Sequence, residues 1–497
     1  MSAGSWLKTQ MRQKLKAIFK GPVVFYPLLF AAFPILFLYA HNISETSASQ
    51  MWLPLVISVV ATLVLWAVLS LILRSLAKAG FATAIFLVFF FSYGRLYDGL
   101  NYLGVFVPKH AYLLPAMLFV WGYCVYFIRR AKRDFRITTR MLNIAAVVLI
   151  AINLFNIGSY QVKLARLSAD TPVESTEHTA ASPAELNTLP DIYFIILDEY
   201  ARSDTMKEWY DYDSSWFIEG LENKGFFIAT ESQTPTGITE RMITGVLNME
   251  YIDDEPSNDQ IYRMIAYNEV AEFLRMRGYK FFYFGNVHDF GRWYTYIKDS
   301  ADLYCNYYEG SSTPWVSEFQ EILWNTTMLK PFYYQLVGGQ YEQAQRRQTL
   351  YTLEHLKTLP EVEGPEFVVT HLYCPHQPFV FGPEGEYISS VNWANYEDKQ
   401  FYLGQYIFIS KEIEQLVDVW LEESETPPII IIQSDHGLRP HHRGIVIGPD
   451  EWRKILNAMY LPGMDYSELS DSMSPANTFR LIFNHYFGAD YPLLEDD

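Results

Sequence analysis

Cysteine is rare in this chain, and acidic residues are almost missing from its first third. Only 3 of the 497 residues are cysteine, too few for a small scaffold held together by disulfides. Residues 1–159 contain 3 acidic and 15 basic residues, whereas the remainder contains 53 acidic and 23 basic ones. The acidic remainder lacks the basic face that phosphate contacts require, which argues against nucleic-acid binding. With 50% hydrophobic residues the chain is not intrinsically disordered, and its two unlike parts exclude a simple soluble enzyme.

Charge is absent from four long apolar runs in the first part of the chain. They are Val23–Ala40, Trp52–Leu73, Ala111–Ile128 and Met141–Ser159. Each is about long enough to cross a hydrocarbon core of about 30 Å. A fifth run, Gly80–Gly94, is shorter, and we expect it to span with a basic residue reaching outward at each end. The alternative for this run is a re-entrant or interfacial segment.

The basic residues between the runs determine the predicted topology. They gather in the N-terminal tail, in residues 74–78 and in residues 129–140, whereas residues 41–51 and 95–110 contain few. Five spans place all three basic stretches on one side of the membrane, as the positive-inside rule requires. We therefore expect a cytoplasmic N-terminus and an outward-facing chain after about Ser159.

These features predict three parts: a five-span transmembrane domain (1–160), a linker (161–190) and an outer domain (191–497). The segment Ser168–Pro190 is polar and rich in Ser, Thr and Pro, which is typical of a linker. Cys305 and Cys374 fall in the outer domain, where a disulfide is chemically allowed; two unpaired thiols are the alternative.

After residue 190, apolar runs of strand length alternate with helical patterns. The expected strands are Ile192–Leu197, Phe226–Ala229, Lys280–Phe284, Phe367–His371, Pro428–Gln433 and Ile455–Leu461, and the expected helices are Asp204–Lys224, Glu269–Arg277, Tyr396–Glu423 and Pro475–Phe487. Continuous runs such as IYFIIL are typical of strands buried on both faces. We predict an α/β domain with a mostly parallel sheet sandwiched by helices.

Acidic residues end two of these expected strands. Asp198-Glu199 follows the first, and Asp435-His436 follows Pro428–Gln433 after one serine. Ligand sites of open α/β sheets lie beyond the carboxyl ends of the strands. Carboxylates and an imidazole gathered there would favour a shared divalent cation. The alternative is that the acidic residues cap the following helices.

Between these strand ends, a stretch with helical character begins at Thr239. A hydroxyl at a helix N-terminus lies near exposed N–H groups and the positive end of the helix dipole, which suits a nucleophile that attacks phosphorus. A plain N-terminal cap is the alternative. Four other hydroxyls compete for the role: Ser232, Thr234, Thr236 and Thr244.

Two further segments carry cation-capable side chains. His376 lies between Pro375 and Pro378 just after an expected strand, where it can bind a phosphoryl oxygen, act as a general acid, or simply pack in its loop. The run Arg439–Arg443 follows the Asp-His pair, and it either grips an anionic substrate or is a solvated loop.

Taken in order, PDIYFIILDEY, the Thr-led helix, PHQPF and SDHG resemble the alkaline phosphatase/sulfatase superfamily. The resemblance is to its five-span membrane transferases, typified by lipoteichoic acid synthase and lipid A phosphoethanolamine transferase, and it covers the spans, the linker and the outer domain. No C/S-x-P-x-R pattern begins the helix, which speaks against the sulfatase branch.

The resemblance implies one divalent metal ion (Mn, Zn or Mg), held by Asp198, Thr239, Asp435 and His436, with Thr239 also acting as the nucleophile. Glu199 competes with Asp198 as the ligand, because a Gly or Ser is more usual at its position.

Two more residues receive roles from the resemblance. His376 would contact the transferred group as a catalytic and substrate-binding residue. Arg292 lies in a segment similar to a family loop that contacts the head group, and it would bind the substrate. The run Arg439–Arg443 is richer in cation-capable side chains than the family pattern, and from it we expect Arg443 to bind the substrate.

The implied activity is transfer of a phosphoethanolamine- or phosphoglycerol-type head group from a membrane phospholipid to an envelope glycan or lipid, through a phospho-threonine. The implied location is the inner (plasma) membrane, with the catalytic domain on the periplasmic or extracellular side. Two other functions stay open: an outward-facing phosphodiesterase or sulfatase-like hydrolase, and a non-catalytic partner of envelope assembly.

Overall fold

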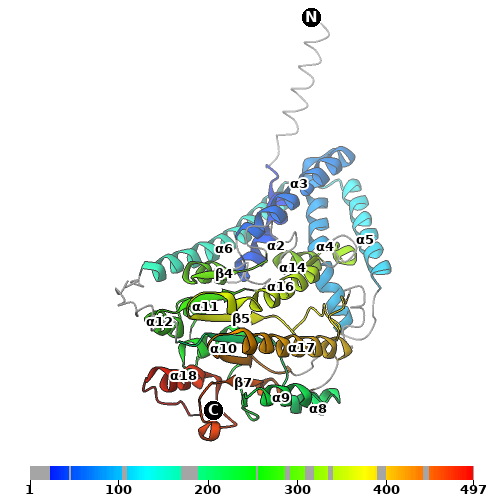
Figure 1. The fold of residues 1–497 in the computed structure, drawn as a ribbon. Coiled ribbons are helices and arrows are strands. Elements are labelled where there is room, and N and C mark those ends of the chain that lie inside the picture. Colours follow the sequence, from blue (N-terminus) through cyan, green and yellow to red (C-terminus); the bar gives the residue numbers. More distant parts are fainter. Residues whose placement is uncertain are drawn as a thin grey trace, which may run out of the picture. The chain divides into compact units, whose positions relative to one another are not determined.

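The computed structural model describes residues 23–43, 46, 48–102, 109–169, 189–252, 256–285, 292–307, 318–333, 340–388, 399–439 and 447–495. The chain divides into two compact units (Figure 1). The helical unit contains residues 1–173 and also 316–337, and the second unit contains residues 174–315 and 338–497. Residues 316–337 therefore pack with the helical unit, although they lie within the predicted outer domain.

Five apolar helices build the helical unit. They are α2 (Tyr26–His41), α3 (Ala48–Leu73), α4 (Leu76–Tyr102), α5 (His110–Arg130) and α6 (Arg136–Ala169). All but α2 are long and apolar enough to cross a membrane. The Gly80–Gly94 run, expected to be the shortest span, lies within the 27 residues of α4, and the shortest apolar helix is instead α2, with 16 residues.

The two predicted basic turns lie side by side at one end of these helices. The ammonium group of Lys78, at the start of α4, donates hydrogen bonds to the carbonyl oxygens of Arg129 (3.2 Å) and Ala131 (2.7 Å) at the end of α5. This contact agrees with a topology in which residues 74–78 and 129–140 share one side of the membrane.

The second unit is built on one seven-stranded sheet. Its strands are β1 (Ile192–Leu197), β2 (Phe227–Ile228), β3 (Lys280–Phe284), β4 (Leu303–Cys305), β5 (Glu366–Leu372), β6 (Ile429–Ser434) and β7 (Asn457–Tyr460), in the order β2-β7-β6-β1-β5-β3-β4. Strands β6, β1, β5, β3 and β4 are parallel neighbours, whereas β7 runs antiparallel to both β6 and β2. The sheet is therefore mixed rather than uniformly parallel.

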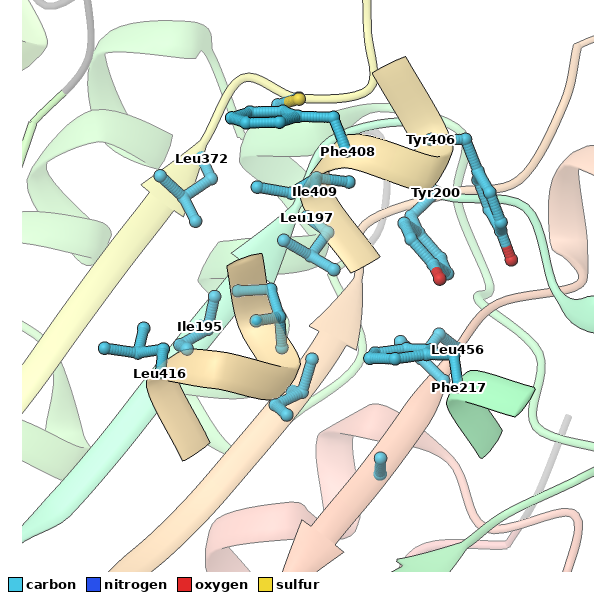
Figure 2. Close-up of a cluster of buried hydrophobic side chains, with 14 of the residues drawn as sticks. Ile195, Leu197, Tyr200, Phe217, Leu372, Tyr406, Phe408, Ile409, Leu416 and Leu456 are labelled. Atoms are coloured by element: carbon cyan, nitrogen blue, oxygen red, sulfur yellow. The ribbon is translucent and has the colours of Figure 1, made fainter. Parts of the chain in front are cut away.

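Helices cover both faces of this sheet because the side chains of β1 alternate between two apolar cores. Tyr193, Ile195 and Leu197 belong to one core, and Ile192, Phe194 and Ile196 belong to the other. The first core is closed by α8 (Ser203–Tyr210), α9 (Ser215–Asn223) and α17 (Lys399–Glu423), and the second by α10 (Thr239–Asn248), α11 (Asn258–Ala266), α12 (Glu269–Arg275) and α18 (Thr478–Phe487). Figure 2 shows residues of β1 and α17 meeting in the first core.

The expected helix Asp204–Lys224 was wrong in one respect, since it forms two helices rather than one. Helix α8 ends at Tyr210, the following Asp211 adopts a left-handed backbone with φ of 54°, and α9 starts at Ser215. The backbone conformation at Asp211 ends the helix, and the break turns both short helices toward the first core.

Candidate active site

The ends of β1 and β6 meet because the two strands are adjacent and in register. Leu197 of β1 lies opposite Ser434 of β6, so the residues that follow each strand leave the sheet together. The backbone N–H of Glu199 donates to Asp435 Oδ1 at 2.9 Å, across 236 residues of sequence. The two acidic strand ends that the sequence predicted to converge therefore do so.

Thr239 is the hydroxyl that reaches this meeting point. It is the first residue of α10, and its Oγ1 donates to Asp435 Oδ2 at 2.5 Å. Three of the competing hydroxyls donate to backbone carbonyls instead: Ser232 to Met473, Thr234 to Thr236, and Thr244 to Glu240. Thr236 Oγ1 accepts from the backbone N–H of Ile238.

His436 is held with one ring nitrogen directed to the backbone. Its Nδ1 lies 2.8 Å from the carbonyl oxygen of Gly437, which as an acceptor fixes the proton on Nδ1 and leaves a lone pair on Nε2. Nε2 accepts from the Arg439 guanidinium at 3.1 Å. A positively charged group thus already lies beside the nitrogen that would bind a metal, and a bound ion would replace this contact.

The donor set fits a divalent cation. Asp198, Asp435 and His436 are buried, and each offers a ligand atom within 4.8 Å of the others. Asp198 Oδ1 is buried without a hydrogen-bond partner among the described residues. Two buried carboxylates with an imidazole and an unsatisfied oxygen are the oxygen and nitrogen ligands that such ions prefer.

The pKa values reflect the same crowding of negative charge. Burial raises the pKa of Asp435, and the neighbouring Asp198 raises it further. Burial also acts to raise the pKa of Asp198, but His376 and His371 outweigh it and lower that pKa. Burial acts to lower the pKa of His436, yet the carboxylates of Asp435 and Asp198 leave it raised. Positive charge is therefore favoured at this site.

Two histidines of the β5 end face the acidic pair of β1. His371, to which the sequence patterns assigned no role, lies in β5 opposite Ile196, with its Nε2 3.2 Å from Asp198 Oδ2. His376 Nε2 lies 4.0 Å from Glu199 Oε2, and its Nδ1 lies 2.7 Å from the carbonyl oxygen of Gln377. His376 thus belongs to this site, and so does Glu199, the alternative ligand.

One face of α17 holds both loops that carry these groups. The hydroxyl of Tyr402 donates a hydrogen bond to the carbonyl oxygen of Glu199 at 2.7 Å. The backbone of Glu199 is left-handed, with φ of 57°. The side-chain amide of Gln405 donates to the carbonyl oxygen of His376 at 2.8 Å and accepts from the N–H of Val380 at 2.9 Å. Tyr402 and Gln405 are buried. No sequence pattern singled them out, because they look like ordinary core positions of a helix.

The remaining predicted residues are only partly described. Arg292 is the first residue of α13 (Arg292–Ser300), but its side chain lies outside the described part of the structure, as does all of Arg443. Cys305 and Cys374 are not joined by a disulfide, and burial raises the pKa of Cys374 well above its usual value.

Comparisons with known proteins give structural neighbours only. No family model and no curated protein matches the chain. The C-terminal periplasmic domain of EptC from Escherichia coli, in complex with Zn, is 12% identical with a TM-score of 0.42, covering 62% of this chain and 88% of its own. The lipoteichoic acid synthase LtaP from Listeria monocytogenes is 11% identical with a TM-score of 0.39, covering 62% and 75%.

A third neighbour includes the membrane part. The integral membrane protein lipooligosaccharide phosphoethanolamine transferase A (EptA) from Neisseria meningitidis is 12% identical with a TM-score of 0.38, covering 92% of this chain and 94% of its own. The function proposed below rests on the residues of this chain.

Proposed function

We propose that this protein is a membrane-anchored, metal-dependent transferase. It would move a phosphoethanolamine- or phosphoglycerol-type head group from a membrane phospholipid to an envelope glycan or lipid. The observation that carries the proposal is the contact of Thr239 Oγ1 with Asp435 Oδ2, within a buried group of three possible metal ligands. A hydroxyl activated in this way suits covalent catalysis by group transfer.

In the first half-reaction, Thr239 Oγ attacks the phosphorus of the donor phosphodiester and its proton passes to Asp435 Oδ2. The phosphorus–oxygen bond to the lipid breaks, and protonated His376 supplies a proton to the departing lipid alcohol. A divalent ion held by Asp198, Asp435, His436 and the Thr239 oxygen would lower the pKa of the hydroxyl and neutralise phosphoryl charge. Glu199 is the alternative to Asp198 in that set.

The second half-reaction reverses these roles. A hydroxyl of the glycan or lipid acceptor gives its proton to His376 and attacks the phosphorus of the phospho-threonine. The bond from phosphorus to Thr239 Oγ breaks, and Asp435 returns the proton to that oxygen. The sequence is ping-pong, because the first product leaves before the acceptor reacts.

The proposed topology has five spans, with α2 as the first, in the inner (plasma) membrane. The basic turn before α4 (residues 74–78) contacts the basic turn after α5 (residues 129–140) through Lys78. This contact supports placing both turns on the cytoplasmic side. The second unit would then lie on the periplasmic or extracellular side, near lipid-borne donor.

The test is mass spectrometry of Thr239 after the full-length protein is incubated with liposomes that contain phosphatidylethanolamine and phosphatidylglycerol. We expect a head-group adduct on Thr239, no adduct in Thr239→Ala, and undiminished transfer in the control Thr236→Ala. Undiminished transfer by Thr239→Ala would overturn the proposal.

Product analysis separates the remaining functions. Release of free phosphorylated head group with an alcohol acceptor present would indicate a hydrolase. Neither adduct nor bound metal in the wild-type protein would indicate a non-catalytic partner.

A further inference from the structure

A segment from within the catalytic half of the sequence is seated in the helical unit. It consists of α14 (Glu318–Thr326) and the short helix η1 (Lys330–Phe332), and we call residues 318–333 the docking segment. Helix α14 packs against α2, α3 and α4. Its Phe319 and Leu323 are 3% and 8% exposed, in a core shared with Ile35, Leu36, Tyr39, Ile43 and Met51.

The backbones of α4 and α14 approach so closely that only glycine fits at one position of α4. A Cβ on Gly94 would overlap the carbonyl oxygen of Asn325 and lie 2.9 Å from Thr326 Cα. Near this point the N–H of Met328 donates to the carbonyl oxygen of Phe90 at 2.9 Å. Backbone contact of this kind requires a fixed seat for the docking segment, because a backbone cannot move aside as a flexible side chain can.

An ion pair extends the contact toward the end of α4. Lys330 Nζ lies 2.5 Å from Asp98 Oδ1 and 5.3 Å from the centre of the Tyr97 ring. Asp98 lies 20 residues beyond Lys78, which marks the basic end of α4. Twenty helical residues rise about 30 Å, the thickness of a hydrocarbon core. The docking segment therefore lies at the opposite end of the helices from the basic turns.

The chain passes between the two units three times, after residues 173, 315 and 337. A single flexible linker between two folded units leaves their relative orientation free. A second attachment restricts that freedom and raises the effective concentration of the site toward a bilayer substrate.

We propose that the docking segment is a positioning element that holds the transfer site in register with lipid-borne donor. The proposal rests on the transferase function proposed above and adds that use of a membrane-embedded donor depends on this attachment. A donor dissolved in water can reach the site from any direction, so transfer from a soluble donor does not depend on this attachment.

The test uses full-length protein in proteoliposomes, with two variants that undock the segment from opposite sides. Gly94→Leu places a side chain where the Asn325 backbone lies, and Leu323→Asp places a charge in the shared core. The matched controls are Gly99→Leu, on the same helix with no atom within 4 Å of a Cβ, and Ile322→Asp, at a position 38% exposed on α14.

The readout is the rate of head-group release or transfer from two kinds of donor. One is phosphatidylethanolamine with phosphatidylglycerol in the bilayer, and the other is glycerophosphoethanolamine with glycerophosphoglycerol in solution. For Gly94→Leu and Leu323→Asp we expect the bilayer rate to fall at least tenfold and the solution rate to stay within twofold of wild type. Both controls should retain both rates.

Unchanged bilayer rates in the undocking variants would overturn the proposal, as would equal losses with both donors, which indicate a merely structural role. If Gly94→Leu does not fold, Leu323→Asp alone decides. If the wild-type protein is inactive on both donors, the proposed transferase function is wrong and this inference fails with it. If the wild type is active and the undocking variants keep its bilayer rate, only this inference is wrong.

Discussion

Gln405 shows how a single buried amide can hold the loop that carries His376. It bonds to the backbone on both sides of His376, and loss of its side chain would leave carbonyl and N–H groups buried without partners. Each such group costs about 1–3 kcal/mol when unsatisfied. The loop is therefore expected to shift rather than bear that cost.

For Gln405→Met we expect the transfer rate to fall about tenfold or more while bound metal is unchanged, because the loop moves but the ligands do not. Enzyme assays and metal analysis of the purified protein measure the two quantities. The control is Trp420→Phe, which removes another buried hydrogen bond of α17, to the carbonyl oxygen of Leu356. An equal loss in both variants would mean that Gln405 serves stability alone.

Sequence patterns found the residues with distinctive chemistry and missed those that look ordinary. Thr239, Asp435 and His436 follow recognisable strand and helix boundaries, so their convergence was predictable. His371 received no role because it lies within a continuously buried strand, where a histidine is indistinguishable from a packed core residue. Gln405 was missed because its role depends on a loop that lies about 30 residues before it in the sequence.

At the scale of single elements, the other end of the sheet carries a second acidic pair. Asp191 precedes β1, and its Oδ1 accepts from the N–H of Glu366, the first residue of β5. Glu366 is fully buried, and burial together with the charge of Asp191 raises its pKa to about 9. The folded protein thus retains a proton on Glu366 that the unfolded chain releases above its ordinary carboxyl pKa.

This pair predicts a dependence of stability on pH. Because the folded-state pKa is raised, the stabilising contribution is complete below the unfolded pKa and is lost as pH rises toward about 9. Glu366→Gln should therefore raise the midpoint of thermal unfolding at pH 8 more than at pH 5, measured on full-length protein in detergent. The exposed Glu363→Gln is the control, and equal effects at both pH values would contradict the prediction.

Element prediction succeeded where the apolar pattern was long and uninterrupted. Strands β1 and β3 have the predicted bounds, because β1 is a continuous apolar run and β3 has four consecutive aromatic residues after Lys280. Strand β4 has only three residues and is too short to be recognised in the sequence. Strand β7 runs antiparallel to β6, and no α-helix among the described residues connects the two, as a parallel pair would usually require. The packing of α14 against the helical unit was not predictable, because an amphipathic pattern does not identify the surface on which a helix packs.

At the scale of the whole molecule, the topology can be tested by labelling. In a Cys124→Ser, Cys305→Ser background, we expect a membrane-impermeant maleimide to label Glu423→Cys in intact cells. The same reagent should label Lys132→Cys only after permeabilisation, because we expect the basic turn to face the cytoplasm. Both positions are exposed to solvent. Labelling of Lys132→Cys in intact cells would contradict the five-span arrangement.

The strand order also determines when the second unit can be completed. Strand β1 is the first to be synthesised, yet Ile192 lies between Phe367 and Ile429, its partners on β5 and β6. Until those late strands arrive, both edges of an apolar strand are open, and such edges are prone to aggregate. The polypeptide must therefore be kept from premature association until nearly the whole chain has been synthesised, so the centre of the sheet is among the last parts to close.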